Sequence, residues 1–268
     1  MHTMNTVDPC QGLHIIKNKL QLKYLAVQAE MLAGCFQKAV ESTRKQAPSR
    51  SRKQGFKLGR AAGRKSPAVM RQADGERYLE ACVFDKWFLD PPTAKAAELW
   101  DHIVGYQFPL YEKGGKGNKK GWDKLDLLGI RDGLPVVIEL KRAKGKESET
   151  PFRALVEAIA NAVALQKIWK EVHPELLELV GRNPGVHATI PVKLPPAPIS
   201  VVVLAPSPYW HYWRTRFDDG KLRGLRPAWL KLIKAAKDAG YRVSMGSLVM
   251  ESDARPPIVR GVEQIPAL

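Results

Sequence analysis

The chain has 268 residues, of which 44% are apolar and 26% are charged, as expected of a folded protein with a buried core. Lys and Arg number 43 against 27 Asp and Glu, so the formal net charge is +16. This surplus favours a polyanionic partner, most commonly nucleic acid, although a basic surface that serves only solubility has the same composition. No apolar run approaches the roughly 20 residues of a membrane-spanning helix, so membrane insertion is not predicted.

The cysteines and the N-terminus predict where the protein resides. Cys10, Cys35 and Cys82 show none of the close spacings that bind a metal ion. We interpret them as reduced thiols of a cytoplasmic protein, since disulfides are rare in that compartment. The first residues lack the basic head and apolar core of a secretory signal, which agrees with this prediction.

Residues 1–41 are predicted to be an N-terminal helical segment. Over residues 12–41, apolar side chains recur at steps of three or four, which places them on one face of a helix. This stripe consists of Ile16, Leu20, Tyr24, Val27, Met31 and Cys35. A lone helix must bury such a stripe, and three surfaces qualify: the core domain, a partner protein, or a second copy of the chain in a homodimer.

Residues 42–73 are predicted to be a basic, flexible linker. Nine of the 25 residues in 42–66 are Lys or Arg and none is acidic, a composition that cannot bury enough apolar surface to fold alone. We expect this segment to contact nucleic-acid phosphates, for example through Arg50, Arg52 and Lys53. A solvated linker without a binding role remains the alternative.

Residues 74–268 are predicted to form an α/β domain with a mixed sheet flanked by helices. Its first elements are a helix over 74–89, with Leu79, Val83 and Trp87 facing inward, and a second helix over 93–103. A strand over 106–112 follows, and Pro109 indicates an edge strand or a bulge.

The next elements form a predicted hairpin and its surroundings. Strands over 125–130 and 135–141 are joined through Asp132-Gly133, a strong hairpin signal. The remaining predictions are a helix over 151–172 capped by Thr150, a strand over 199–205, a helix over 227–239 and a strand over 241–250. An aromatic segment over 209–217 favours core packing, with stacking on unpaired bases as the alternative.

Three charged residues of the hairpin carry the predicted chemistry. Glu139 and Lys141 share one face of their strand, and a tight turn places Asp126 of the neighbouring strand opposite Glu139. The surrounding residues are apolar, and burying such charges is unfavourable unless they pair or bind a metal ion. Carboxylate oxygens are the ligands that Mg²⁺ prefers. An exposed salt bridge between Glu139 and Lys141 is the alternative interpretation.

Asp126 in LDLLG and Glu139-Leu140-Lys141 at the end of VVIELK resemble the motif of the PD-(D/E)xK nuclease superfamily. The resemblance implies a restriction-endonuclease-like fold with the core order αβββαβ. It also implies that Asp126 and Glu139 bind Mg²⁺ or Mn²⁺, that Lys141 orients or activates the attacking water, and that the first helix adds an acid. Glu80 is our choice for that acid, with Glu76 one turn earlier as a substitute. Leu125 departs from the Pro or Gly that often precedes the first Asp.

The resemblance predicts an Mg²⁺-dependent nuclease, most simply a DNA endonuclease. A basic loop before the Asp126 strand is expected to hold the nucleic-acid backbone, unless it is merely solvated; its lysines are Lys113, Lys116, Lys119 and Lys120. Three helix residues, Glu157, Asn161 and Gln166, are weaker candidates for the site. The alternatives are a catalytically inactive DNA-binding protein on the same fold and an interaction protein recruited through its N-terminal helix.

Overall fold

The computed structural model describes residues 8–49, 76–89, 98–110, 122, 124–143, 149–181, 199–219, 224–251 and 258–268. Part of the predicted nucleic-acid interface lies outside these residues, namely Arg50, Arg52, Lys53, Lys113, Lys116, Lys119 and Lys120. The start of the helix predicted over 93–103 also lies outside them.

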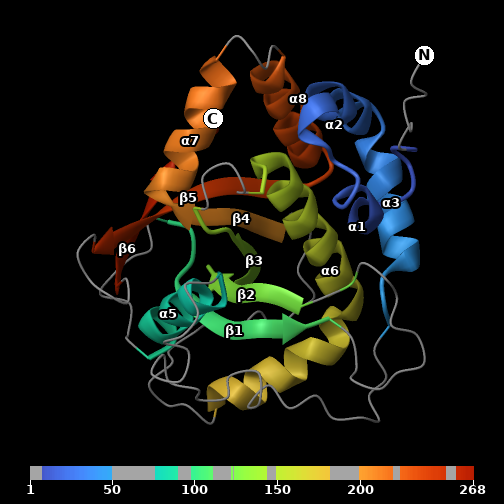
Figure 1. Cartoon of the computed structure of the whole chain (residues 1–268). Helices are drawn as coiled ribbons and strands as arrows, with labels where there is room; N and C mark the ends of the chain where they lie inside the picture. The colour runs from blue at the N-terminus through green and yellow to red at the C-terminus, as the bar shows by residue number, and fades with distance from the viewer. Residues whose placement is uncertain are drawn as a thin grey trace.

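Six strands of the described residues form one mixed sheet in the order β1-β2-β3-β4-β5-β6 (Figure 1). The strands are β1 His102–Pro109, β2 Lys124–Arg131, β3 Leu134–Leu140, β4 Ile199–Pro206, β5 Tyr241–Glu251 and β6 Ile258–Ile265. β1, β2 and β3 form an antiparallel meander, β3, β4 and β5 run parallel, and β6 pairs antiparallel with β5. The predicted mixed α/β architecture is therefore confirmed.

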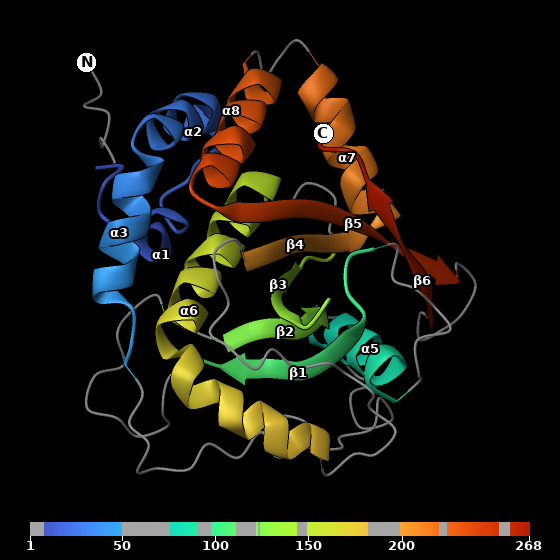
Figure 2. The ribbon, with the colours of Figure 1, turned by 180° about the vertical axis from the view of Figure 1, so that it is seen from behind.

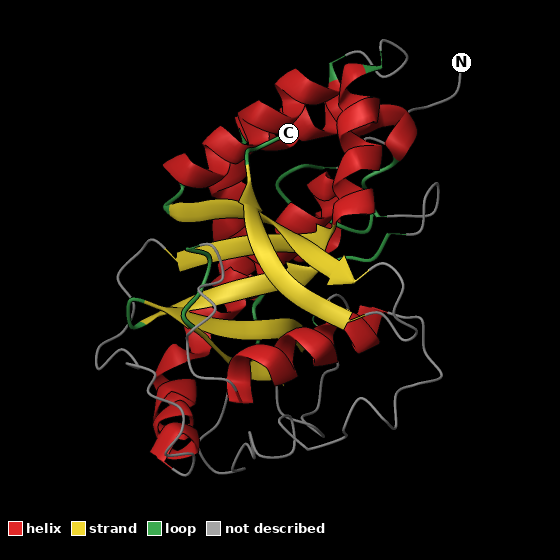
Figure 3. Ribbon diagram, turned by 90° about the vertical axis from the view of Figure 1, so that its left-hand side faces the viewer, coloured by secondary structure: helices red, strands yellow, loops and turns green. Residues whose placement is uncertain are grey.

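Helices cover both faces of this sheet. They are α5 Glu76–Leu89, α6 Pro151–Gly181, α7 Ser207–Asp218 and α8 Leu225–Asp238. One large apolar cluster joins α6, α7 and α8 to one face, and a smaller cluster joins α5 to the other. Figure 3, a side view, shows the strands running through the molecule with helices above and below them. The element order α5-β1-β2-β3-α6-β4 follows the chain without interruption by another described element.

The N-terminal segment is built from short elements rather than one long helix. These are α1 Leu13–Ile16, the 3₁₀ turn η1 Leu22–Tyr24, α2 Leu25–Gly34 and α3 Phe36–Gln46. They lie beside α6 and α8 in both views of the ribbon (Figures 1 and 2). Of the three surfaces left open by the sequence, these elements use the chain's own core.

The expected apolar stripe of this segment was partly wrong. Val27 and Met31 are 51% and 43% exposed, whereas Leu25, Ala29 and Leu32 of the same helix are buried. The break between α1 and α2 causes the error, because it resets the helical phase that a continuous 12–41 helix would impose.

Several local predictions are confirmed by the described elements. The hairpin turn has φ of 50° at Asp132 and 75° at Gly133, the left-handed conformation that favours Asp-Gly. Thr150 Oγ1 accepts a hydrogen bond from Arg153 N (3.2 Å) and Pro151 opens α6, although α6 continues beyond residue 172 through Pro174. β1 is an edge strand that ends at Pro109.

Two other predictions need correction. Leu99 lies in a turn, Trp100 forms a β-bridge and Ile103 lies in β1, so the end of the helix predicted over 93–103 was wrong. Glu98 begins this turn with φ of 62°, a backbone conformation outside any right-handed helix. The final strand β6 was not predicted from the sequence.

Candidate metal centre and ion-pair network

The β2–β3 hairpin brings Asp126 against Glu139, as the sequence predicted. Leu127 pairs with Ile138 in this antiparallel hairpin, so Asp126, one residue before Leu127, faces Glu139, one residue after Ile138. Asp126 Oδ2 accepts a hydrogen bond of 2.8 Å from Leu140 N, which fixes its carboxylate on the end of β3. Asp126 is half-buried, and side chains of α5 reach it across this strand end.

Glu76 and Glu80 of α5 complete a cluster with Asp126, which we name the acidic triad. Carboxylate oxygens from the three residues lie within 4.8 Å of one another. Glu76 and Glu80 lie one turn apart on the face of α5 that meets the sheet. Opposite oxygen ligands are separated by roughly 4 Å around Mg²⁺ and roughly 5 Å around Ca²⁺. The oxygen set therefore fits a hard divalent cation.

Lys141 lies beside the triad at the end of β3 and is surrounded by carboxylates. Its Nζ donates to Glu139 Oε1 at 2.6 Å and lies 3.0 Å from Glu149 Oε2. Oxygens of Glu76 and Glu157 follow at 3.5 and 3.7 Å. Lys141 and Glu139 are only 4% and 3% exposed, so the alternative of an exposed salt bridge was wrong.

Helix α6 supplies the other side of this arrangement. Asn161 Nδ2 donates to Glu139 Oε2 (3.4 Å), and Glu157 lies between Lys141 and Lys17 of the N-terminal segment. Arg153 pairs with Glu149 at 3.1 Å. We name these charged residues the ion-pair network: Lys17, Glu139, Lys141, Glu149, Arg153 and Glu157. Glu76 joins the network to the triad through Lys141.

Gln107 of β1 is a further residue of the site. It lies opposite Asp126, between the pairs Tyr106–Leu127 and Phe108–Leu125. Its side-chain amide donates to Glu80 Oε2. Its backbone has φ of 47°, a left-handed conformation that is unfavourable for a residue with a side chain and that often accompanies a functional constraint.

The protein environment opposes ionisation of the triad. Burial raises the pKa of Glu80 to about 7, and the nearby Glu76 and Glu139 act in the same direction. Burial and the charge of Glu80 raise the pKa of Asp126 well above its usual range, and burial also raises the pKa of Glu76. Within the described residues, no Lys or Arg forms an ion pair with Glu80 or Asp126. The charge of Lys141 lowers the pKa of both residues, but burial outweighs it, and a bound cation would lower it further.

The network differs at Glu157 and Lys141, although burial and the charge of Asp126 raise the pKa of its Glu139 well above the usual range. Burial alone would raise the pKa of Glu157, but Lys141 and Lys17 lower it below its usual range. Burial alone would lower the pKa of Lys141, but Glu139, Glu157, Asp126 and Glu76 together raise it well above its usual range. Glu157 and Lys141 are therefore held in their charged forms.

The structure brings Asp126, Glu139, Lys141 and Glu80 together, and Glu76 joins them. Glu76 takes the third position of the triad, whereas both oxygens of Glu139 accept hydrogen bonds from Lys141 and Asn161. Glu139 as a metal ligand stays a prediction. Of the three helix candidates, Glu157 and Asn161 reach the site, and no described contact joins Gln166 to it.

Sequence reasoning missed Lys17, Gln107, Glu149 and Arg153. The aromatic segment forms α7, where Trp210 and Trp213 are buried in the core, as the favoured interpretation predicted.

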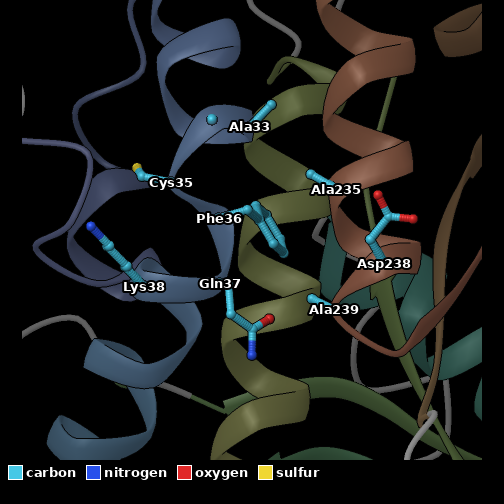
Figure 4. Close-up of a pocket in the computed structure, with 9 residues that line it drawn as sticks. Ala33, Cys35, Phe36, Gln37, Lys38, Ala235, Asp238 and Ala239 are labelled. Carbon is cyan, nitrogen blue, oxygen red and sulfur yellow. The ribbon is translucent and has the colours of Figure 1, made fainter.

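A separate hollow lies away from these residues, between the α2–α3 junction and the end of α8 (Figure 4). Phe36, Ala235 and Asp238 line it together with Cys35. Asp238 pairs with Lys234 at 2.6 Å. This hollow contains none of the residues predicted for chemistry.

Comparisons with known proteins leave the family open. No protein-family model, no curated protein and no solved structure significantly matches the chain. Among the described helices, none has both the length and the apolar character required to cross a bilayer.

Proposed function

We propose that the chain is a divalent-metal-dependent nuclease that hydrolyses phosphodiester bonds in DNA. The observation that carries this proposal is the acidic triad, whose oxygens lie within 4.8 Å, with the buried ammonium of Lys141 beside it. The basic surplus of the chain favours a nucleic-acid substrate.

The arrangement of elements supports a restriction-endonuclease-like core. A helix precedes three antiparallel strands, and α6 then returns the chain so that β4 pairs parallel with β3. The hairpin motif lies at the ends of β2 and β3, under α5. Each of these features agrees with the resemblance of Asp126, Glu139 and Lys141 to the PD-(D/E)xK motif.

Each residue then has a distinct task. Glu76, Glu80 and Asp126 would hold Mg²⁺ or Mn²⁺. The bound ion would polarise a phosphoryl oxygen and lower the pKa of a water molecule. Lys141 would hold the attacking water in place and stabilise negative charge that develops on the phosphate. Glu139 accepts hydrogen bonds from Asn161 and from Lys141, and so would hold the Lys141 ammonium beside the triad.

Cleavage of supercoiled plasmid and of end-labelled linear DNA, with Mg²⁺, Mn²⁺ or EDTA, tests the proposal. We expect metal-dependent cleavage that is lost in Asp126→Asn and Lys141→Ala. The matched control is Asp132→Asn, which neutralises an exposed carboxylate in the turn of the same hairpin and should cleave normally. An RNA of the same sequence tests the choice of substrate.

DNA binding without cleavage under every metal would overturn the enzymatic proposal and favour the inactive DNA-binding protein. The absence of both binding and cleavage would favour the interaction protein recruited through its N-terminal segment.

A further inference from the structure

Lys17 is the one ammonium of the network that comes from the N-terminal segment. It caps the C-terminal end of α1 and is only 6% exposed, a rare state for a lysine. Its Nζ donates to Glu157 Oε1, a residue 140 positions later in the chain. The other oxygen of Glu157 faces Lys141 at 3.7 Å. One carboxylate thus lies between an N-terminal lysine and the lysine of the ExK motif.

The position of Lys17 is fixed by the packing of α1. Leu13 and Ile16 are buried in the large core cluster, and Leu13 N donates to Thr43 Oγ1 of α3 at 2.7 Å. His14 stacks on Trp122, just before β2, with ring centroids 4.5 Å apart. Next to Lys17, Asn18 Oδ1 accepts a hydrogen bond from Arg153 of α6. These contacts hold the ammonium against α6.

The charges suggest what Lys17 does. Four carboxylates approach Lys141, so the position of its ammonium depends on how strongly each attracts it; they belong to Glu76, Glu139, Glu149 and Glu157. Lys17 supplies a second cation to Glu157, which weakens the attraction between Glu157 and Lys141. Without Lys17, Glu157 would be a buried carboxylate with Lys141 and the more distant Arg153 as its cations. Lys141 would then move from Glu139 toward α6, away from the triad.

We propose that Lys17 is a positioning residue of the nuclease site, acting through Glu157 to keep Lys141 next to Glu139 and the acidic triad. This inference rests on the proposed function. It makes the N-terminal segment part of the catalytic unit, in addition to whatever it contributes to substrate binding.

The test is a double-mutant cycle on the full chain. Lys17→Met, Glu157→Gln and the double variant are compared with wild type for single-turnover cleavage at saturating DNA and for DNA affinity. The matched control is Lys19→Met, which removes a nearby ammonium of the same segment whose one side-chain partner among the described residues is Gln11. Thermal unfolding reports whether each variant is folded.

We expect Lys17→Met to lower the cleavage rate at saturating DNA by roughly 10²-fold, the scale of an effect from a misplaced catalytic group. DNA affinity should stay within about twofold, and Lys17→Arg should restore most of the rate, because it returns a cation to Glu157. In the Glu157→Gln background, Lys17→Met should change the rate by no more than about twofold. If Lys17→Met does not fold, Lys17→Gln takes its place with the same expected loss of rate, because its amide can donate a hydrogen bond to Glu157 but carries no charge.

Three results would overturn the inference. They are a normal rate in Lys17→Met, effects of the two substitutions that multiply independently, or a loss confined to DNA affinity. An inactive wild-type protein would instead refute the proposed function, and this inference with it.

Discussion

Two groups of acidic side chains meet at the end of β3, and they differ in the cations that pair with them. In the ion-pair network, Lys17, Lys141 and Arg153 neutralise three glutamates. In the acidic triad, Glu80 and Asp126 form no ion pair with a described Lys or Arg, and their pKa values are raised. The comparison shows that Lys and Arg side chains pair with the acids of the network, whereas an external cation bound at the triad is part of the proposed function.

The largest expected effect comes from breaking the ion-pair network. Lys141→Met should destabilise the metal-free protein by about 3–5 kcal/mol at pH 8, because it leaves buried glutamates without their cation. Chemical denaturation in EDTA measures this. Equal stability of the variant and the wild type would mean that the network is not electrostatically balanced as described.

Metal affinity should distinguish the acidic triad from the ion-pair network most directly. We expect Asp126→Asn to weaken Mn²⁺ binding by more than the roughly 10–100-fold typical of an outer-shell partner, whereas Glu157→Gln should stay within that range. Isothermal titration calorimetry with Mn²⁺ compares the two variants. If both lose affinity equally, the triad is not the distinct metal centre.

The pH dependence of stability should show which acids have a raised pKa in the folded protein. The pKa of Glu80 rises from its ordinary 4.5 to about 7, so the folded protein retains a proton that the unfolded chain releases. Its contribution is therefore most favourable below pH 4.5 and is lost as the pH rises to about 7.

Glu80→Gln removes this loss and keeps an oxygen for the Gln107 amide. We expect it to stabilise the metal-free protein at pH 8 by about 1–3 kcal/mol. Thermal unfolding in EDTA at pH 5 and pH 8 checks this: the gain should vanish near pH 5. A variant that is less stable than wild type at pH 8 would show that Glu80 is already compensated.

An exposed ion pair is expected to have the smallest effect on the free energy of unfolding. Lys231 of α8 and Glu30 of α2 lie 2.6 Å apart, with side chains 61% and 45% exposed. We expect Glu30→Gln to change the free energy of unfolding by less than about 1 kcal/mol. A loss comparable to that of Lys141→Met would remove the distinction between buried and exposed pairs.

Much of the site could be predicted because its signals are local. The Asp132-Gly133 turn and the alternation of β3 determine that Asp126 faces Glu139 and that Glu139 and Lys141 share a face. Glu80 came from the family resemblance, which implies an acid on the first helix, and the helical repeat added Glu76 one turn earlier. These relations involve neighbours along the chain or across one tight turn.

The remaining features depend on contacts between distant residues. Lys17 belongs to a segment rich in lysine, and nothing nearby in the sequence distinguishes it from Lys19 or Lys23. Only packing of α1 on α6 gives it Glu157 as a partner. Similarly, Gln107 acquires its role from the register of β1 on β2. The 12–41 helix was overpredicted because the break after α1 contains no Gly or Pro, and Gly34, which ends α2, was placed inside a continuous helix.

The link between Lys17 and Glu157 also bears on the order of folding. A growing chain that has passed Lys141 already contains the triad and the ExK motif, yet Glu157 has not been synthesised. β3 can gain its parallel neighbour β4 only after α6 has crossed back over the sheet. The Lys141 site is therefore completed only when residues far apart in the sequence come into contact. Such contacts form slowly compared with a hairpin. If Lys17 acts as proposed, a nascent chain would remain inactive until the domain has closed.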